Sequence, residues 1–161
     1  MNTLSDLLTS NLPTYEITIP SSNTKTTYRP FLVKEEKILL LAQESGSNFE
    51  ILRAIQRILE CCVDGIDDAS SLPLFDVEYL FIKLRAKSVS ELAQPTIVCP
   101  YTDEKIKFDI NLMEIELQRT EGHSNKIKIS NNIIMEMKYP SLQILIQQER
   151  ELNYNDPESF Y

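Results

Sequence analysis

The chain has 161 residues, which is enough for one compact domain with its own core and hardly enough for two. Hydrophobic residues make up 42% and charged residues 25%, a composition that is typical of globular proteins and argues against intrinsic disorder. The formal net charge is −8 and the lysines are interleaved with acidic residues, so nucleic acid is excluded as a default partner because like charges repel.

Cysteine usage and the first residues indicate the compartment. The three cysteines are Cys61, Cys62 and Cys99, an odd count, and a vicinal pair does not form an ordinary disulfide. The opening "MNTLSDLLTS" has neither a basic region nor a long apolar run, so we expect no signal peptide, and no run approaches transmembrane length. These features predict a soluble protein of the cytoplasm without a membrane partner.

The chain begins with a predicted β-hairpin. Tyr15, Ile17 and Ile19 alternate with polar residues, which is the period of a half-buried strand. The turn cluster "PSSNTK" follows, and the return strand is expected from about Thr26 to Val33. Pro30 has no backbone N–H, so it should lie at an edge or a bulge.

Three helices are predicted next. "VKEEKILLLAQES" has Glu35 and Glu36 in its first turn, where carboxylates suit the helix dipole, and its expected buried stripe is Ile38, Leu41 and Ala42. Ser47 and Glu50 form the pattern of a capping box for the second helix, whose apolar face is Phe49, Leu52, Ile55, Leu59 and Cys62. "LFDVEYLFIKLRAKS" is the third, with Asp76 as its predicted cap and a ragged continuation to Pro95. The apolar face of this third helix is Val77, Leu80, Phe81 and Leu84.

After Pro95 the hydrophobic period changes to two. "TIVCP" and "KIKFDINL" bracket the turn "YTDE", and "KIKISNNIIMEMKYP" predicts a further hairpin around Asn131 and Asn132. A last helix starts near Ser141. The prediction is an α+β fold with an N-terminal β-hairpin, a helical middle, C-terminal antiparallel hairpins and a final helix. We expect a single domain, 1–161, with possible subdomains 1–95 and 96–161.

Residue types that carry out catalysis or bind metals are sparse. His123 is the only histidine and lies in the polar segment "RTEGHSNK", so a solvated loop residue is favoured over a general base. The cysteines lack the spacing of a zinc site, and all three are interpreted as small buried hydrophobic residues.

Acidic clusters and glycines do not change this interpretation. Asp64, Asp67 and Asp68 lack the alternating ligands and the terminal glutamate of an EF-hand loop. The three glycines are too scattered for a phosphate-binding loop: Gly46, Gly65 and Gly122. We therefore predict no enzyme activity, no cofactor, no metal and no small-molecule substrate.

The stretch "LPTYEITIPSSNTKTTYRPFLVKEEKILLLAQES" resembles the N-terminal segment of the baseplate hub subunit family of T-even-like contractile-tailed bacteriophages. "ILRAIQRILECCV", "CPYTDEKIKFDINL" and "IKISNNIIMEMKYPS" are also similar to that family, so the resemblance spans nearly the whole chain. Members are expected to continue with a further helical segment after the last helix, whereas this sequence stops at "NDPESFY". The family includes both hub subunits and assembly factors.

The resemblance implies a non-enzymatic structural or assembly protein of a phage tail baseplate hub. It implies protein–protein contacts with other baseplate or hub proteins, assembly in the host cytoplasm, and a place in the tail baseplate if the protein is a structural component. An alternative from another class is a small acidic host-directed binding module or inhibitor.

The join between the first hairpin and the first helix is the predicted interface. Tyr28, Arg29 and Phe31 are expected to project from a strand edge, with Glu35 and Glu36 as a charged rim. Aromatic residues and arginine are the types that most often contribute binding energy at interfaces. In the competing interpretation, Phe31 and Ile38 only staple the helix onto the core.

Overall fold

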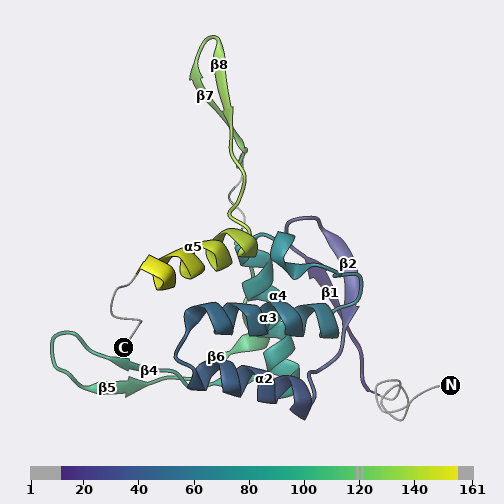
Figure 1. Cartoon of the computed structure of the whole chain (residues 1–161), viewed down its shortest axis with the longest axis vertical. Coiled ribbons are helices and arrows are strands. Elements are labelled where there is room, and N and C mark those ends of the chain that lie inside the picture. Colours follow the sequence, from purple (N-terminus) through teal and green to yellow (C-terminus); the bar gives the residue numbers. More distant parts are fainter. Residues whose placement is uncertain (1–11, 119, 121, 156–161) are drawn as a thin grey trace.

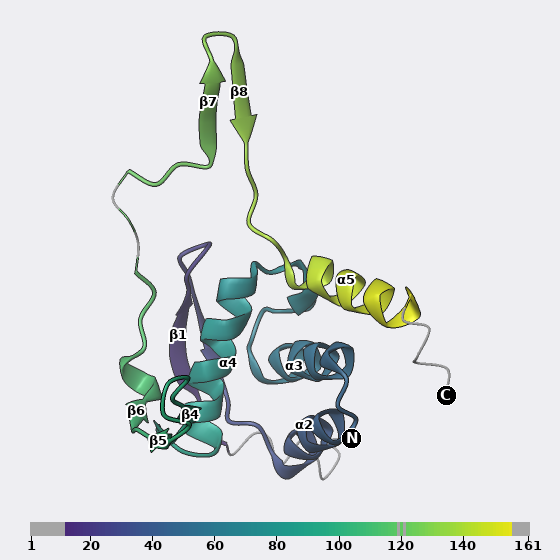
Figure 2. The same cartoon turned by 90° about the vertical axis from the view of Figure 1, so that its left-hand side faces the viewer.

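The computed structural model describes residues 12–118, 120 and 122–155, and it confirms the α+β class. Three helices lie side by side: α2 (Val33–Glu44), α3 (Asn48–Cys62) and α5 (Leu142–Asn155) (Figure 1). Helix α4 (Leu74–Ser88) runs across them, as the turned view makes plain (Figure 2). The central helix α3 contacts all three of the others, so it organises the core.

The N-terminal hairpin closes one side of this body. Strand β1 (Tyr15–Ile19) pairs with β2 (Thr24–Tyr28), and Ile17 and Ile19 are buried as the alternation predicts. The tight turn between the strands places Asn23 at positive φ. The return strand ends at Tyr28, before the predicted end at Val33, because Arg29 N–H donates to Cys62 O at the end of α3.

The core is built from fully buried side chains of α3, α4 and α5: Ile58, Leu59, Leu80, Leu84 and Leu142. The predicted face of α3 is confirmed in part, since Leu52 and Ile55 also pack against the core, but it omits Ile58. Leu59 and Cys62 are buried as expected, but Leu52 and Ile55 are half-buried, and Ile58 lies at the centre instead. The reason is that α3 is covered on several sides, so a single apolar stripe does not describe its environment.

Helix α2 also differs from its predicted stripe. Ala42 is buried, but Ile38 is half-buried and Leu41 is 55% exposed. Leu39 packs against the core in place of Leu41. Helix α2 is one of the two outer helices of the three that lie side by side (Figure 1), so much of its surface does not meet the core.

Helix α4 begins and ends at residues other than those predicted from the sequence. The helix begins at Leu74, so Asp76 lies inside the first turn instead of capping it, and its buried carboxylate accepts the Ser21 N–H at 2.9 Å. The helix ends at Ser88 and does not continue to Pro95. Instead β3 (Leu92–Ala93) pairs with β6 (Ile110–Asn111), because the chain between them returns as a hairpin.

The second half confirms two further antiparallel hairpins. Strand β4 (Thr96–Val98) pairs with β5 (Lys105–Lys107), and β7 (Lys126–Ser130) pairs with β8 (Ile133–Glu136). Short 3-10 helices, η1 (Ala69–Ser71) and η2 (Leu112–Glu114), complete the elements, and α5 begins one residue after the predicted start. Since η2 contacts α4 and α5 contacts α3, residues after 95 share the core with residues before 95. The division into subdomains 1–95 and 96–161 stays a prediction.

Candidate protein–protein interface

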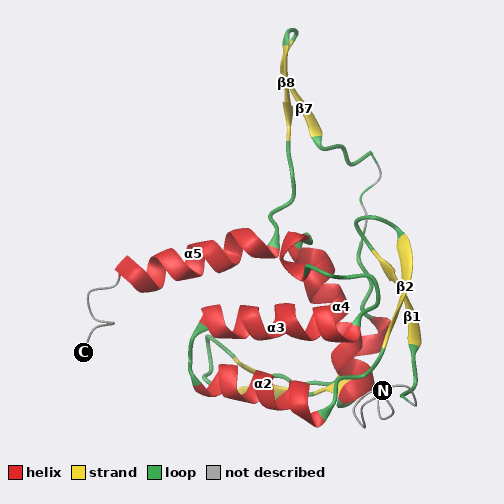
Figure 3. Ribbon diagram, turned by 45° about the vertical axis from the view of Figure 1, so that its right-hand side comes forward, coloured by secondary structure: helices red, strands yellow, loops and turns green. Residues whose placement is uncertain are grey.

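Two hairpins extend away from the body in different directions (Figure 1), and Figure 3 also shows β7 and β8 projecting from it. The first arm (residues 95–109) contains β4 and β5, and the second arm (residues 123–139) contains β7 and β8. Each strand pair forms a separate two-stranded sheet that no other described strand extends. A two-stranded hairpin is marginally stable alone in water, so each arm has backbone edges and side chains available for a partner.

Apolar side chains of both arms are exposed. In the first arm they are between 38% and 94% exposed: Ile97, Val98, Tyr101, Ile106 and Phe108. In the second arm they are between 41% and 66% exposed: Ile127, Ile129, Ile133, Ile134, Met135 and Met137. Single exposed apolar residues are ordinary, but groups gathered on a projecting element are typical of interaction sites.

The register shows that the second arm is amphipathic. Ile127 lies opposite Met135, which places these two side chains on one face. Lys126 lies opposite Glu136 and Lys128 lies opposite Ile134, which places these four on the other face. One side of the arm is thus apolar and the other carries the lysines.

The second arm is fixed to the body where its return leg reaches α4 and α5. The ring of Tyr139 packs edge-on against Phe75 at 4.9 Å between centroids, and its hydroxyl is 2.5 Å from Nε2 of His123. Leu74 N–H donates to Pro140 O at 3.0 Å, and Leu142 N–H donates to Leu72 O at 3.1 Å. His123 is an exposed loop residue as predicted, but it also connects the two legs of the arm.

Lys83 fastens the chain where it leaves the first arm, and sequence reasoning missed it. This α4 residue is 6% exposed, and its ammonium donates to the carbonyls of Leu112 at 3.3 Å and Met113 at 2.6 Å. Burial lowers the pKa of Lys83. The signal available in the sequence was that Lys83 falls on the predicted apolar face of this helix. A lysine buried there needs fixed hydrogen-bond acceptors.

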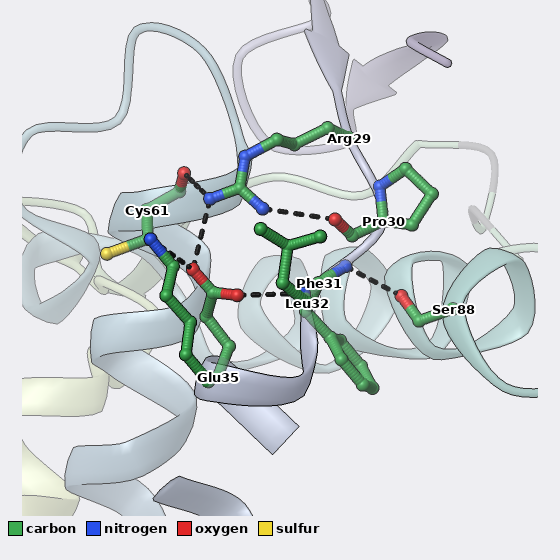
Figure 4. A network of polar contacts seen from close by, with 8 residues as sticks. Arg29, Pro30, Phe31, Leu32, Glu35, Cys61 and Ser88 are labelled. Carbon is green, nitrogen blue, oxygen red and sulfur yellow. Dashed lines mark hydrogen bonds and ion pairs between the residues drawn. The ribbon is translucent and has the colours of Figure 1, made fainter. Parts of the chain in front are cut away.

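The predicted interface at Tyr28–Glu36 forms an internal corner (Figure 4). The Arg29 guanidinium lies 3.2 Å from the Glu35 carboxylate and donates to Cys61 O at 3.0 Å. The second Glu35 oxygen accepts the Leu32 N–H at 2.8 Å, so the residue closes the start of α2. Phe31 N–H donates to the Ser88 hydroxyl at 2.9 Å, which ties the corner to α4.

The electrostatics of Glu35 follow from these contacts. Burial by itself raises the pKa of the carboxyl, but the Leu32 N–H, the Arg29 guanidinium and Lys34 act in the opposite direction. Their sum holds the pKa of Glu35 below its ordinary value. The carboxylate is therefore a charged structural group at neutral pH.

Burial of the corner favours the interpretation that its aromatic residues belong to the core. Tyr28 is 4% and Phe31 9% exposed, so neither projects from a strand edge, and Glu35 is buried as well. The physical reason is that β2 ends at Tyr28, which pairs with Val63 just after the C-terminal end of α3, and the Arg29 N–H donates to Cys62 O there. Glu36 is exposed, and the prediction that this corner contacts a partner stays a prediction.

The cysteines differ from one another. Cys62 is buried, and this burial raises the pKa of its thiol to about 12. Cys61 is exposed and Cys99 is intermediate, so the expectation that all three are buried is wrong. A hydrogen bond with the Thr102 side chain, followed by backbone contacts, lowers the pKa of Cys99.

Within the described ranges, no group of three or more histidine, cysteine or acidic side chains is arranged to hold a metal ion. None of the helices in those ranges is long and apolar enough to cross a bilayer. The chemical features that stand out are the exposed apolar and charged side chains of the two arms.

The sequence profile of the family described as "T4 bacteriophage base plate protein" matches residues 12–160. The chain belongs to this family. It is thus a structural protein of a phage baseplate, a part of the virion tail. Neither a curated protein nor a solved structure matches this baseplate protein. The family supports the predicted phage role over the alternative of a host-directed inhibitor.

Proposed function

We propose that this baseplate protein is a non-enzymatic component of the baseplate hub, and that it connects neighbouring hub or baseplate proteins through its two arms. The observation that carries the proposal is the exposure of apolar side chains along both projecting hairpins. Burying such surface is the dominant favourable contribution to most protein–protein association.

The body and the arms have different roles in this proposal: the body positions the arms, and the arms bind the neighbouring proteins. The body has a continuous core and internal anchors such as Lys83 and the Arg29–Glu35 pair, so it can hold the arms in fixed positions. The arms leave it in different directions, so one chain can reach two neighbours (Figure 1). Each neighbour gains apolar area and backbone hydrogen bonds from the hairpin that it receives.

The proposal also concerns when and where the protein acts. It is made in the host cytoplasm, joins the hub during assembly and remains in the finished tail. A protein that only assists assembly would have to release both arms afterwards, which would return their apolar surface to water. We expect other baseplate proteins to be its partners, rather than nucleic acid, membranes or small molecules.

Purified particles provide the test. Quantitative mass spectrometry should find this chain in tails made by a phage that carries the wild-type gene. Substituting the cross-strand pair of the second arm, Ile127→Ser with Met135→Ser, should reduce that amount without lowering the melting temperature of the free chain, because the pair lies outside the core. A control variant on the N-terminal hairpin, Lys25→Ser, removes an exposed side chain from the body and should be incorporated normally. Absence of the wild-type chain from particles would overturn the proposal.

A further inference from the structure

The two edges of the second arm are not equivalent. The edge of β7 is interrupted by a register shift between Lys128 and Ser130, and lysines line the rest of it. Bulges and lysines are features that protect an edge strand against pairing. The edge of β8 runs through Ile133, Ile134 and Met135 without a bulge or a proline, so it is the unprotected edge.

The hydrogen-bond pattern shows which backbone groups of β8 point outward. Met137 N–H donates to Asn125 O at 2.8 Å, so these two residues form a hydrogen-bonded pair. Pair types alternate along an antiparallel ladder. Because Glu136 and Ile134 occupy the intervening positions opposite Lys126 and Lys128, their N–H and C=O groups point away from β7.

Charge on the arm indicates what an added strand would carry. The carboxylate of Glu136 already has partners within the arm, since it lies opposite Lys126 and accepts a hydrogen bond from Asn125 Nδ2 at 3.2 Å. Lys128 and Lys138 form no ion pair with any described residue. The arm is thus locally positive in a chain whose formal net charge is −8, and complementary charges favour association.

We propose that β8 accepts an extended segment of another baseplate protein by antiparallel or parallel strand addition, and that this segment alternates apolar with acidic residues. Its apolar side chains extend the face of Ile127 and Met135, and its carboxylates lie on the same face of the sheet as Lys128 and Lys138. Its backbone satisfies the outward groups of Ile134 and Glu136. The added strand turns a marginal two-stranded hairpin into a three-stranded sheet. This inference rests on the proposed function and specifies how the second arm acts within it.

A matched pair of variants at one position tests the backbone contact. Ile134→Ala and Ile134→Pro both remove the exposed side chain, but only proline also removes the outward N–H. In phage lacking the gene and supplied with each variant, Ile134→Pro should be incorporated into particles roughly tenfold less than Ile134→Ala, because one partner carbonyl is left unsatisfied. The free variants should melt at the same temperature, since this donor is not used within the arm.

Hydrogen exchange on the wild-type chain gives a readout that does not depend on the variants folding. The Ile134 and Glu136 amides should exchange fast in the free chain and slowly in assembled tails. A photo-crosslinker at Ile134 should capture an acidic segment of a different baseplate protein. Charge reversal at Lys138 should weaken incorporation more than reversal at Lys25, an exposed lysine of the body.

The possible outcomes separate the two proposals. If the chain is present in particles but both amides stay fast, or if the alanine and proline variants are incorporated equally, strand addition at β8 is overturned and the hub role stands. Capture of a second copy of this chain would overturn the assigned partner. If the wild-type chain is absent from particles, both proposals fail.

Discussion

The Arg29–Glu35 pair gives the sharpest stability prediction, because one substitution removes the partner of a buried charge. The Glu35 side chain is 3% and that of Arg29 16% exposed, and their N–O distance is 3.2 Å. Breaking a buried ion pair costs about 3–5 kcal/mol when the other charge is left behind. In Arg29→Ala the Leu32 N–H still faces the carboxylate at 2.8 Å, and Lys34 lies at 3.4 Å.

These remaining contacts place the expected loss at the low end, about 3 kcal/mol of unfolding free energy. For a chain of this length the corresponding fall in melting temperature is roughly 6–12 °C. Chemical denaturation followed by circular dichroism measures the loss, which should appear as a lower midpoint with an unchanged slope. Arg29→Lys should lie between wild type and Arg29→Ala, because lysine keeps the charge but not the forked geometry.

The matched control is Glu36→Gln, which changes an exposed carboxylate on the adjacent residue of the same helix. It should change stability by no more than about 0.5 kcal/mol. A loss below about 1 kcal/mol for Arg29→Ala would mean that the pair behaves as a surface ion pair and would refute the reasoning. Normal stability with poor incorporation into particles would instead support the sequence-based prediction that this corner is an interface.

Three further predictions concern the body. Leu59→Ala should lower the unfolding free energy by about 2–5 kcal/mol, because the side chain is fully buried. The control Arg57→Ala, at an exposed residue, should change it little, and similar values for the two would mean that the packing of α3 is misassigned. A thiol reagent should modify Cys61 in the native protein and Cys62 only on unfolding, since Cys62 is buried and its pKa is about 12; rapid native reaction at Cys62 would contradict this. Because the pKa of Glu35 is lowered in the folded state, its ionised carboxylate contributes to stability above the ordinary value of 4.5, and this contribution decreases as pH falls below that value. Wild type should therefore lose more stability in acid than Glu35→Gln does. Parallel curves of stability against pH for the two proteins would exclude this linkage.

Much of the fold could be predicted because local patterns and tertiary structure agree. The alternation at Tyr15–Ile19, the Ser47 cap of α3 and the turn at Asn131–Asn132 each specify an element through its own residues. The Ser47 hydroxyl does accept the Glu50 N–H, as the capping pattern predicts.

The errors arise where tertiary contacts override such patterns. Ile58 and not Leu52 lies at the centre of the core, because α3 is covered on several sides. Asp76 reads as a cap in isolation, but its carboxylate binds the backbone of Ser21, 55 residues away. Periodicity along one segment contains no information about such distant partners.

The candidate site was only partly accessible to sequence reasoning. Aromatic residues and arginine at Tyr28–Phe31 suggested an interface by type, but burial within this chain is decided by where β2 ends. The alternating residues of β7 and β8 were predicted as a hairpin, yet alternation does not show whether the apolar face meets the body or solvent. Only the structure shows that both hairpins extend away from the core (Figure 1).

A cryo-electron microscopy map of the intact baseplate tests the central claim most directly. The account predicts that density for this chain lies in the hub, with the apolar side chains of both arms covered by neighbouring proteins and a strand of one neighbour beside β8. A hub without this chain, or a bound chain whose arms remain in solvent while other surfaces make the contacts, would contradict it.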